Sequence, residues 1–257
     1  MIELKNIDKS FSNNVETHQI FDDFSFKINQ GDFICVLGSN GAGKSTLLNL
    51  IGGKIKPCNG QILLEDKDIT SLDEYKRSQN ITRIFQDVKL GTVEELTVFE
   101  NLLMAENKNK RFNLSFMKNS KRKEFYKEKL KEFELNLEDK LETKVMSLSG
   151  GQRQCIAILM AKLMNPKVLL LDEHTAALDP KTSTKVMDIT NEIIKEENLT
   201  SLMVTHNISH ALDYGNRLIM MDKGKVIVDI DKKKTNNLTK EKLLALFKNP
   251  NDQTLFS

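Results

Sequence analysis

The chain has few cysteines, little net charge and no long apolar run. Only three of its 257 residues are cysteines, and Cys35, Cys58 and Cys155 are scattered without the spacing of a metal site. This usage is typical of a reduced, cytosolic protein rather than of a disulfide framework. The formal net charge of +2 is too small to indicate nucleic-acid binding through bulk electrostatics.

No segment of the sequence predicts export or membrane insertion. The first residues lack the apolar core of a secretory signal, and no stretch approaches the roughly 20 apolar residues that span a bilayer. Hydrophobic residues make up 39% and charged residues 29% of the chain, a mixture typical of globular proteins. If the protein serves a membrane process, we therefore expect it to act from the cytosolic side, with the membrane pathway on another polypeptide.

Strand-like and helix-like patterns alternate along the chain. Apolar and polar residues alternate over 24–28, and residues 33–37 are continuously apolar, as in a strand buried on both faces. Further strands are predicted at 61–64, 81–85, 168–172, 201–205, 217–221 and 225–229, the last two as a hairpin. Helices are predicted after the glycine-rich segment that follows residue 37 and at 98–104, 121–135 and 152–164.

These patterns predict one domain with an insertion. The domain takes residues 1–230, with an α/β core at 1–86 and 166–230 and a helical subdomain at 87–165. A polar tail, 231–257, follows and contains one helical patch at 240–247.

A glycine-rich loop follows the predicted strand at 33–37. Residues 38–45, GSNGAGKS, match the pattern G-x-x-x-x-G-K-[ST] without a mismatch. Glycines let backbone N–H groups point at phosphate oxygens, and the next helix adds its positive N-terminal end. We expect Lys44 to bind the β- and γ-phosphates and the Ser45 hydroxyl to ligate Mg²⁺. The alternative is a glycine-rich turn that only links a strand to a helix.

The residues expected to bind nucleotide in this segment are Gly38, Ser39, Asn40, Gly41, Ala42, Gly43, Lys44, Ser45 and Thr46.

Two acids follow the apolar run at 168–171. In open α/β sheets, ligands bind beyond the carboxyl ends of the strands, where Asp172 and Glu173 are predicted to lie. We predict that Asp172 holds Mg²⁺ through water and that Glu173 orients and polarises the attacking water as a general base. The alternative is a pair of acids that caps a helix. The phosphate loop earlier in the chain favours the catalytic interpretation.

A third motif lies between the first two. Leu148, Ser149, Gly150, Gly151 and Gln152 combine a small hydroxyl and two glycines with a helix predicted to begin near Gln152, which makes another anion site. The sequence LSGGQ resembles the signature motif of ABC-type ATPases, and the order of the three motifs is that of the family. The resemblance covers almost the whole chain, from about residue 2 to residue 230.

The resemblance implies a fold, cofactors and an assembly. The implied fold is α/β, a P-loop NTPase of ABC type with a mixed sheet core, an antiparallel β edge and an inserted helical subdomain. The implied cofactors are ATP and Mg²⁺. In this family the signature motif contacts the γ-phosphate that a second copy binds. Ser149, Gly150, Gly151 and Gln152 are therefore expected to bind the partner's ATP in a head-to-tail homodimer.

Further positions match elements of the family. Gln86, in the sequence IFQD, resembles the glutamine that senses Mg²⁺ and the attacking water. Asp179 ends AALD, which resembles the loop that communicates across the dimer, and His206 resembles the histidine that contacts the γ-phosphate. Phe11 lies where the family places an aromatic ring that stacks on adenine. The alternatives are a structural histidine at a strand end and a core phenylalanine.

The chain departs from the family at one position in these motifs. His174 follows Glu173 where most relatives have proline, and we expect no loss of activity because histidine fits a tight turn. The sequence LDEHTAALDP resembles a narrower group of bacterial importer ATPases, some of which serve uptake of aromatic amino acids.

The predicted function is ATP hydrolysis that powers solute transport through a separate membrane permease. Import of a small solute such as an amino acid is favoured, with an extracytoplasmic solute-binding protein as a further partner, no nucleic acid, and a peripheral position on the cytoplasmic face of the membrane. The alternatives are an exporter subunit and a soluble ABC ATPase of translation or DNA repair. A non-catalytic binding module is disfavoured because Glu173 and His206 are both present.

Overall fold

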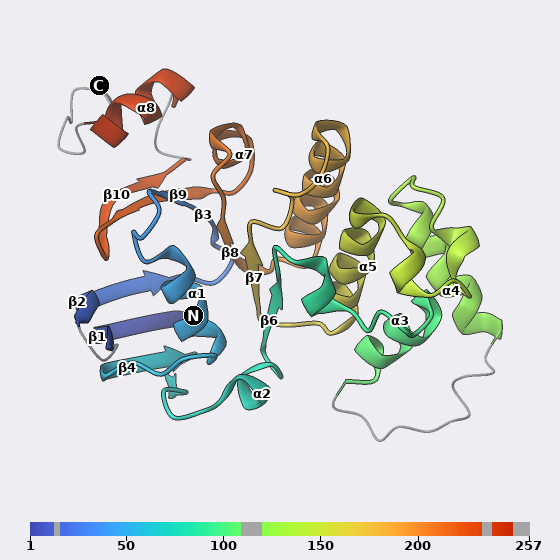
Figure 1. Ribbon diagram of the computed structural model, residues 1–257, viewed down its shortest axis with the longest axis horizontal. Helices are drawn as coiled ribbons and strands as arrows, with labels where there is room; N and C mark the ends of the chain where they lie inside the picture. The colour runs from blue at the N-terminus through green and yellow to red at the C-terminus, as the bar shows by residue number, and fades with distance from the viewer. Residues whose placement is uncertain (13–15, 109–119, 233–237, 249–257) are drawn as a thin grey trace. The chain divides into compact units, whose positions relative to one another are not determined.

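The computed structural model describes residues 1–12, 16–108, 120–232 and 238–248 (Figure 1). The chain forms two compact units, one made of Met1–Ser78 with Asn198–Ser257 and the other of Gln79–Glu197. The predicted helical subdomain falls inside the second unit, whose described residues also form two strands. The predicted subdomain boundaries themselves stay a prediction. Among the described residues, no helix is both long and apolar enough to cross a membrane.

An antiparallel sheet in the first unit has the strand order β2-β1-β4-β5. Its strands are β1 (Ile2–Ser12), β2 (Thr17–Ile28), β4 (Asn59–Leu64) and β5 (Lys67–Asp68). Phe24, Phe26 and Ile28 of β2 are buried while their neighbours are exposed, which confirms the predicted half-buried strand. Two buried rings of this strand, Phe21 and Phe24, stack with centroids 4.5 Å apart.

The parallel strands of the first unit centre on β3 (Phe33–Gly38), which is buried along its whole length. β3 lies between β8 (Thr200–Val204) and β9 (Arg217–Asp222) and runs parallel to both. β10 (Lys225–Asp231) pairs with β9 in antiparallel fashion, which confirms the predicted hairpin. The continuous apolar run of β3 is typical of a strand buried on both faces, and all five residues of β8 are buried as well.

The first unit also contains the helices α1 (Lys44–Gly52), α2 (Glu74–Arg77), α7 (Ile208–Asp213) and α8 (Lys240–Lys248). α8 confirms the predicted helical patch of the tail, and its Leu243 and Leu246 are buried. The C-terminal end of α1 is closed by the buried Arg77, whose Nη1 donates to the carbonyls of Leu50 (2.6 Å) and Ile51 (3.0 Å). Burial lowers the pKa of this guanidinium to about 10.

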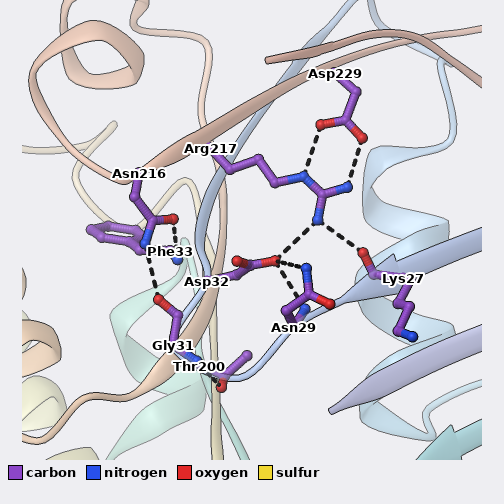
Figure 2. A network of polar contacts seen from close by, with 9 residues as sticks. All are labelled: Lys27, Asn29, Gly31, Asp32, Phe33, Thr200, Asn216, Arg217 and Asp229. Atoms are coloured by element: carbon purple, nitrogen blue, oxygen red, sulfur yellow. Dashed lines mark hydrogen bonds and ion pairs between the residues drawn. The ribbon is translucent and has the colours of Figure 1, made fainter. Parts of the chain in front are cut away.

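A polar network joins the amino-terminal ends of the parallel strands β3 and β9 (Figure 2). The Arg217 guanidinium, at the start of β9, donates through Nε and Nη2 to Asp229 (2.8 and 2.6 Å) and through Nη1 to Asp32 (3.0 Å) and the Lys27 carbonyl (2.9 Å). The amide of Asn216 bridges the carbonyl of Gly31 and the N–H of Phe33. The network therefore ties the segment before β3 to β9 and β10.

The described residues of the second unit form two parallel strands and several helices. The strands are β6 (Ile81–Ile84) and β7 (Val168–Asp172). The helices are α3 (Val98–Glu106), α4 (Ser120–Lys131), α5 (Gly150–Leu163) and α6 (Pro180–Glu196), with shorter 3₁₀ turns η1 (Val88–Gly91), η3 (Glu138–Lys140) and η4 (Val145–Ser147).

The predicted helices at 98–104, 121–135 and 152–164 are confirmed, with shifted ends. α4 ends at Lys131 rather than near 135 because the backbone turns through the left-handed region at Glu134, with φ +47°. α6 was not predicted. Its N-cap is Asp179, Pro180 occupies its first turn, and its buried residues Val186, Thr190 and Ile193 recur at helical spacing.

Candidate functional site

The predicted phosphate loop lies between β3 and α1, so the expected order of strand, loop and helix is confirmed. Gly41 (φ +79°) and Gly43 (φ +100°) adopt left-handed backbone, which disfavours any residue with a side chain. A Cβ atom on Gly43 would also lie 3.1 Å from the ring of the buried Phe21. The conformation and packing of the loop therefore both require glycine.

The turn between β9 and β10 braces this loop. The N–H of Gly224 donates to the carbonyl of Ala42 (3.1 Å), and the Ser39 hydroxyl donates to Asp222 (3.3 Å). A Cβ atom on Gly224 would lie 1.8 Å from the carbonyl oxygen of Ile20, so only glycine lets the turn come this close. The sequence predicted the hairpin but not its contact with the loop.

Lys44 places a cation inside the loop. The residue is only 6% exposed, and its Nζ donates to the carbonyls of Gly38 (2.7 Å) and Ser39 (2.8 Å). α1 begins at Lys44 with Gly43 as its N-cap, so no side chain caps the helix. The Ser45 hydroxyl lies on the first turn, and its residue is exposed. A helix N-terminus, an ammonium group and a hydroxyl together suit a phosphate with a bound cation.

His206 lies beyond the same ends of the parallel strands as the phosphate loop. β8 runs beside β3, with Val204 opposite Val36, so the segments that follow the two strands leave one edge of the sheet. His206 is exposed, and Asn207 after it caps α7 by accepting from the N–H groups of Ser209 and His210. This position suits the predicted contact with a γ-phosphate.

Phe11 lies on β1 and is 43% exposed, which excludes the alternative of a core phenylalanine. It pairs with His18 of β2, and the Lys9 ammonium lies 4.9 Å from the centre of its ring. An exposed aromatic ring beside a cation can accept a flat base against its face. Its contact with adenine stays a prediction.

In the second unit, Gln86 and the acidic pair follow neighbouring parallel strands. Ile84 of β6 lies opposite Leu171 of β7, so Gln86, Asp172 and Glu173 leave the same edge of this pair of strands. Gln86 is exposed, whereas Asp172 and Glu173 are half-buried. The structure thus places at one edge three of the residues that were predicted to act on the metal and the attacking water.

Asp172 has a partner that the sequence did not predict. Its Oδ2 accepts from Nη2 of Arg83, and the two side chains are 18% and 11% exposed. Arg83 lies on β6, opposite Leu170 of β7. The alternation of residues along a strand could have placed Arg83 on the same face as Asp172, but only once the pairing of β6 with β7 was known.

Glu173 has unusual backbone geometry. Its φ of +45° lies in the left-handed region, which is costly for a residue with a side chain. The turn continues with a hydrogen bond from the N–H of Ala176 to the Glu173 carbonyl (2.9 Å), and it contains the buried His174. The turn therefore sets the backbone from which the Glu173 side chain projects.

The loop after this turn ends at Asp179, which caps α6. Its Oδ1 accepts from the N–H of Thr182 (3.1 Å), and the hydrogen bonds from Thr182 lower the pKa of the carboxyl group. Asp179 therefore has a local structural role besides any role toward nucleotide.

The signature segment forms the start of α5, which begins at Gly150 rather than near Gln152 as predicted. Ser149 is the N-cap, because its hydroxyl accepts from the N–H of Gln152 (3.3 Å) while Oε1 of Gln152 accepts from the N–H of Ser149 (3.2 Å). Gln152 also accepts from Lys140 (3.1 Å) and donates to the carbonyl of Leu135 (3.1 Å). Its side chain therefore organises the signature segment within the unit.

The second glycine of the signature has a packing role. A Cβ atom on Gly151 would lie 2.5 Å from Cγ2 of Thr182 on α6. Glycine therefore lets the N-terminal ends of α5 and α6 approach each other, which the anion-site interpretation of Gly151 did not anticipate.

Comparison with known proteins gives one family. The model described as "ABC transporter" matches residues 21–176, a span that includes the phosphate loop, the signature segment and the acidic pair. The chain is 50% identical to a tyrosine transport ATP-binding protein of Clostridioides difficile, over 96% of this chain and 98% of that protein. It is 33% identical to a xylose/arabinose import ATP-binding protein of Sulfolobus acidocaldarius, over 92% and 90% of the two chains.

A solved structure gives the same result. It is described as a dimeric ATP-binding cassette in a post-hydrolysis state bound to ADP and Pi. This chain matches it with a TM-score of 0.77 and 31% sequence identity, over 90% of this chain and 99% of that one.

Proposed function

This chain belongs to the ABC transporter family and is an ATPase that powers import, and we propose that it drives uptake of an aromatic amino acid, with tyrosine as the leading candidate. The observation that carries the choice of solute is the 50% identity to a tyrosine transport ATP-binding protein over nearly the whole length of both chains. The solute itself is bound by other subunits, so the residues of this chain support the ATPase activity and not the choice of solute.

The nucleotide is held chiefly by the phosphate loop. Lys44 already lies inside the loop through its bonds to the carbonyls of Gly38 and Ser39, so an anion meets the ammonium group in a fixed place. The N-terminal end of α1 adds N–H donors that no side chain caps. Phe11 stacks on adenine in this proposal, and its exposure supports that role.

The residues present fit a bound Mg²⁺. This ion prefers oxygen ligands, and Ser45, Gln86 and Asp172 supply a hydroxyl, an amide oxygen and a carboxylate. When bound, Mg²⁺ neutralises charge on the β- and γ-phosphate oxygens. Ser45 is exposed on the first turn of α1, Asp172 is the last residue of β7, and Gln86 lies two residues after the adjacent strand β6.

Three side chains take part in the proposed hydrolysis: Glu173, His206 and Lys44. Glu173 accepts a proton from the attacking water as its oxygen bonds to the γ-phosphorus, while the bond from that phosphorus to the β–γ bridging oxygen breaks. The products are ADP and inorganic phosphate. The strained turn at Glu173 fixes the base before the reaction, which lowers the cost of orienting it. His206 contacts the γ-phosphate, and Lys44 offsets its charge.

The active assembly is proposed to be a head-to-tail homodimer. Ser149, held as the N-cap of α5, and the N–H groups of Gly150 and Gly151 form the anion site that contacts the nucleotide of the second copy. The likeness to a cassette described as dimeric and bound to ADP and Pi supports this assembly. A membrane permease and an extracytoplasmic solute-binding protein complete the proposed system, with this chain on the cytoplasmic face of the membrane.

The solute is tested by uptake. Deletion of the gene should abolish uptake of radiolabelled tyrosine, and a plasmid that encodes the wild-type protein should restore uptake. A plasmid that encodes Glu173→Gln should not restore uptake, while Glu197→Gln, a change at an exposed glutamate, should. Tryptophan uptake tests the wider aromatic class, and xylose uptake serves as the control. Undiminished uptake of both aromatic amino acids would contradict the proposed solute and leave the ATPase activity untouched.

A further inference from the structure

We infer that Arg83 is a positioning residue that weakens the affinity of the nucleotide site for its divalent cation by holding Asp172 in an ion pair. The inference rests on the proposed role of Asp172 as the acid that holds the cation through water. It adds a residue outside the predicted motifs, because Arg83 lies in the middle of β6 and not in a loop.

The pairing of two strands sets the contact. Arg83 lies opposite Leu170 in the parallel pair of β6 and β7, and Asp172 is two residues further along β7 on the same face. Nη2 of Arg83 donates to Oδ2 of Asp172. The ring of Phe85, which directly follows β6, lies 5.0 Å from Cζ of the guanidinium and packs against it.

The environment makes this pair strong. The side chains of Arg83 and Asp172 are only 11% and 18% exposed, so water and salt screen their attraction much less than at the surface. The planar guanidinium of Arg83 donates to the carboxylate in a fixed geometry, and its positive charge offsets the charge of Asp172.

A divalent cation and an arginine compete for the same carboxylate. Arg83 uses a lone pair of Oδ2 and reduces the negative potential at the carboxylate, so a divalent cation held through water meets a weaker ligand. The proposed contact to the cation then falls to Oδ1. A nearby charge of this kind shifts an equilibrium by about tenfold when it lies a few ångströms away in a partly buried place.

The alternative role of Arg83 is purely structural. In that case the ion pair only holds β6 beside β7, and its loss lowers stability without strengthening cation binding. The two roles therefore differ in the sign of the effect on cation affinity. Thermal stability does not separate them, because loss of Arg83 lowers it in either case.

The experiment uses Mn²⁺ as a probe, with full-length protein and saturating ADP, and follows free Mn²⁺ by electron paramagnetic resonance. Arg83→Met should bind Mn²⁺ about tenfold more tightly than the wild type. Arg83→Lys keeps the charge and should stay near the wild type. Arg83→Gln is a second neutral variant, which serves if Arg83→Met does not fold. ADP affinity in the presence of EDTA should not change in any of them.

Two controls place the effect at Asp172. Arg153→Met breaks a comparable, partly buried pair in the same unit, to Glu94 at 2.7 Å, and should leave Mn²⁺ affinity unchanged. In an Asp172→Asn background, Arg83→Met should no longer strengthen Mn²⁺ binding, because the two changes act through one carboxylate.

Three outcomes would overturn the inference. They are unchanged or weaker Mn²⁺ binding in the neutral variants, an equal increase in Arg83→Lys, and an increase that survives in the Asp172→Asn background. A wild-type protein that binds neither ADP nor Mn²⁺–ADP would instead contradict the proposed function. The two failures are therefore distinguishable.

Discussion

The two ends of the parallel strands in the first unit are built in opposite ways. At the amino-terminal ends, Arg217 contacts Asp229, Asp32 and the Lys27 carbonyl through a guanidinium whose Nε, Nη1 and Nη2 all donate (Figure 2). At the carboxyl-terminal ends, the chain passes into a glycine loop with left-handed backbone, and His206 is exposed beyond β8. The amino-terminal ends are joined by hydrogen bonds and ion pairs, whereas the carboxyl-terminal ends present polar groups that can bind a ligand.

The difference separates stability from function along one set of strands. Ligands of α/β proteins bind beyond the carboxyl ends of parallel strands, because the loops and helix N-termini gather there. At the amino-terminal ends, the polar groups instead bond to one another. Substitutions at the amino-terminal ends should therefore lower stability, whereas substitutions at site residues of either unit should lower nucleotide binding or hydrolysis. The following variants test this difference from the largest expected effect to the smallest.

Glu173→Gln should have the largest effect on chemistry. Glutamine keeps the shape of the side chain but cannot accept the proton, so ATP turnover should fall by roughly 10²-fold or more while ATP still binds. An ATP-bound dimer should then accumulate, which light scattering with ATP and Mg²⁺ would detect. Glu197→Gln, an exposed change, is the control and should hydrolyse ATP normally. Near-normal turnover by Glu173→Gln would remove Glu173 from the catalytic role.

Lys44→Ala should weaken nucleotide binding. The change removes a charge-assisted contact to the phosphates, which is typically worth about 1.5–3 kcal/mol. Titration with a fluorescent ATP analogue should show an affinity loss of at least several-fold. The exposed Lys54 lies just beyond α1, so Lys54→Ala is a matched control and should bind ATP like the wild type. Equal affinity of Lys44→Ala and the wild type would exclude Lys44 from the site.

Arg217→Met should lower stability and leave nucleotide binding unchanged. Loss of the guanidinium leaves Asp32 and Asp229 without their shared partner, and the free energy of unfolding should fall by about 2 kcal/mol. The figure lies below that for a fully buried pair because Asp229 is 41% exposed. Denaturant titration measures the loss, and ATP affinity at a temperature where the variant is folded should not change. Weaker ATP binding by the folded variant would break the comparison between the two ends.

Ser149→Arg should block the proposed composite site in the second unit. A bulky cation at the N-terminal end of α5 would occupy the place of the partner's γ-phosphate, so hydrolysis should fall by about tenfold or more while ATP binding by the monomer survives. Ser149→Ala is the control for the lost N-cap, which costs about 1 kcal/mol of stability without adding bulk. Mixing Ser149→Arg with Lys44→Ala protein should restore at most one intact site. Normal hydrolysis by Ser149→Arg would contradict the head-to-tail dimer.

Local patterns predicted much of the fold, and tertiary contacts account for what was missed. The buried strand at 33–37 and the hairpin at 217–229 could be predicted because their residues and turn suffice to define them. α6 was missed although Asp179 and Pro180 mark its start. Asp179 was predicted only as a site residue, although it is also the N-cap of this helix.

The candidate site shows the same division. Lys44 and the glycines of its loop could be named because phosphate binding constrains consecutive residues. Three contacts could not be predicted, because each depends on which strands or helices lie together. They are the contacts of Arg83 with Asp172, of Gly224 with Ala42 and of Gly151 with Thr182. A linear pattern carries no information on such pairs until the topology is known.

Phe11 should give the smallest effect and tests whether the binding region extends to β1. Its ring is exposed and lies beside Lys9, so Phe11→Ala removes a stacking surface without opening a cavity in the core. ATP affinity should fall by about 1 kcal/mol, roughly fivefold, while the free energy of unfolding stays near that of the wild type. Phe11→Tyr keeps the ring and should bind ATP normally. Inorganic triphosphate, which lacks a base, should bind equally well to all three proteins. If Phe11→Ala weakened ATP and triphosphate alike, the ring would support the phosphate loop rather than stack on adenine.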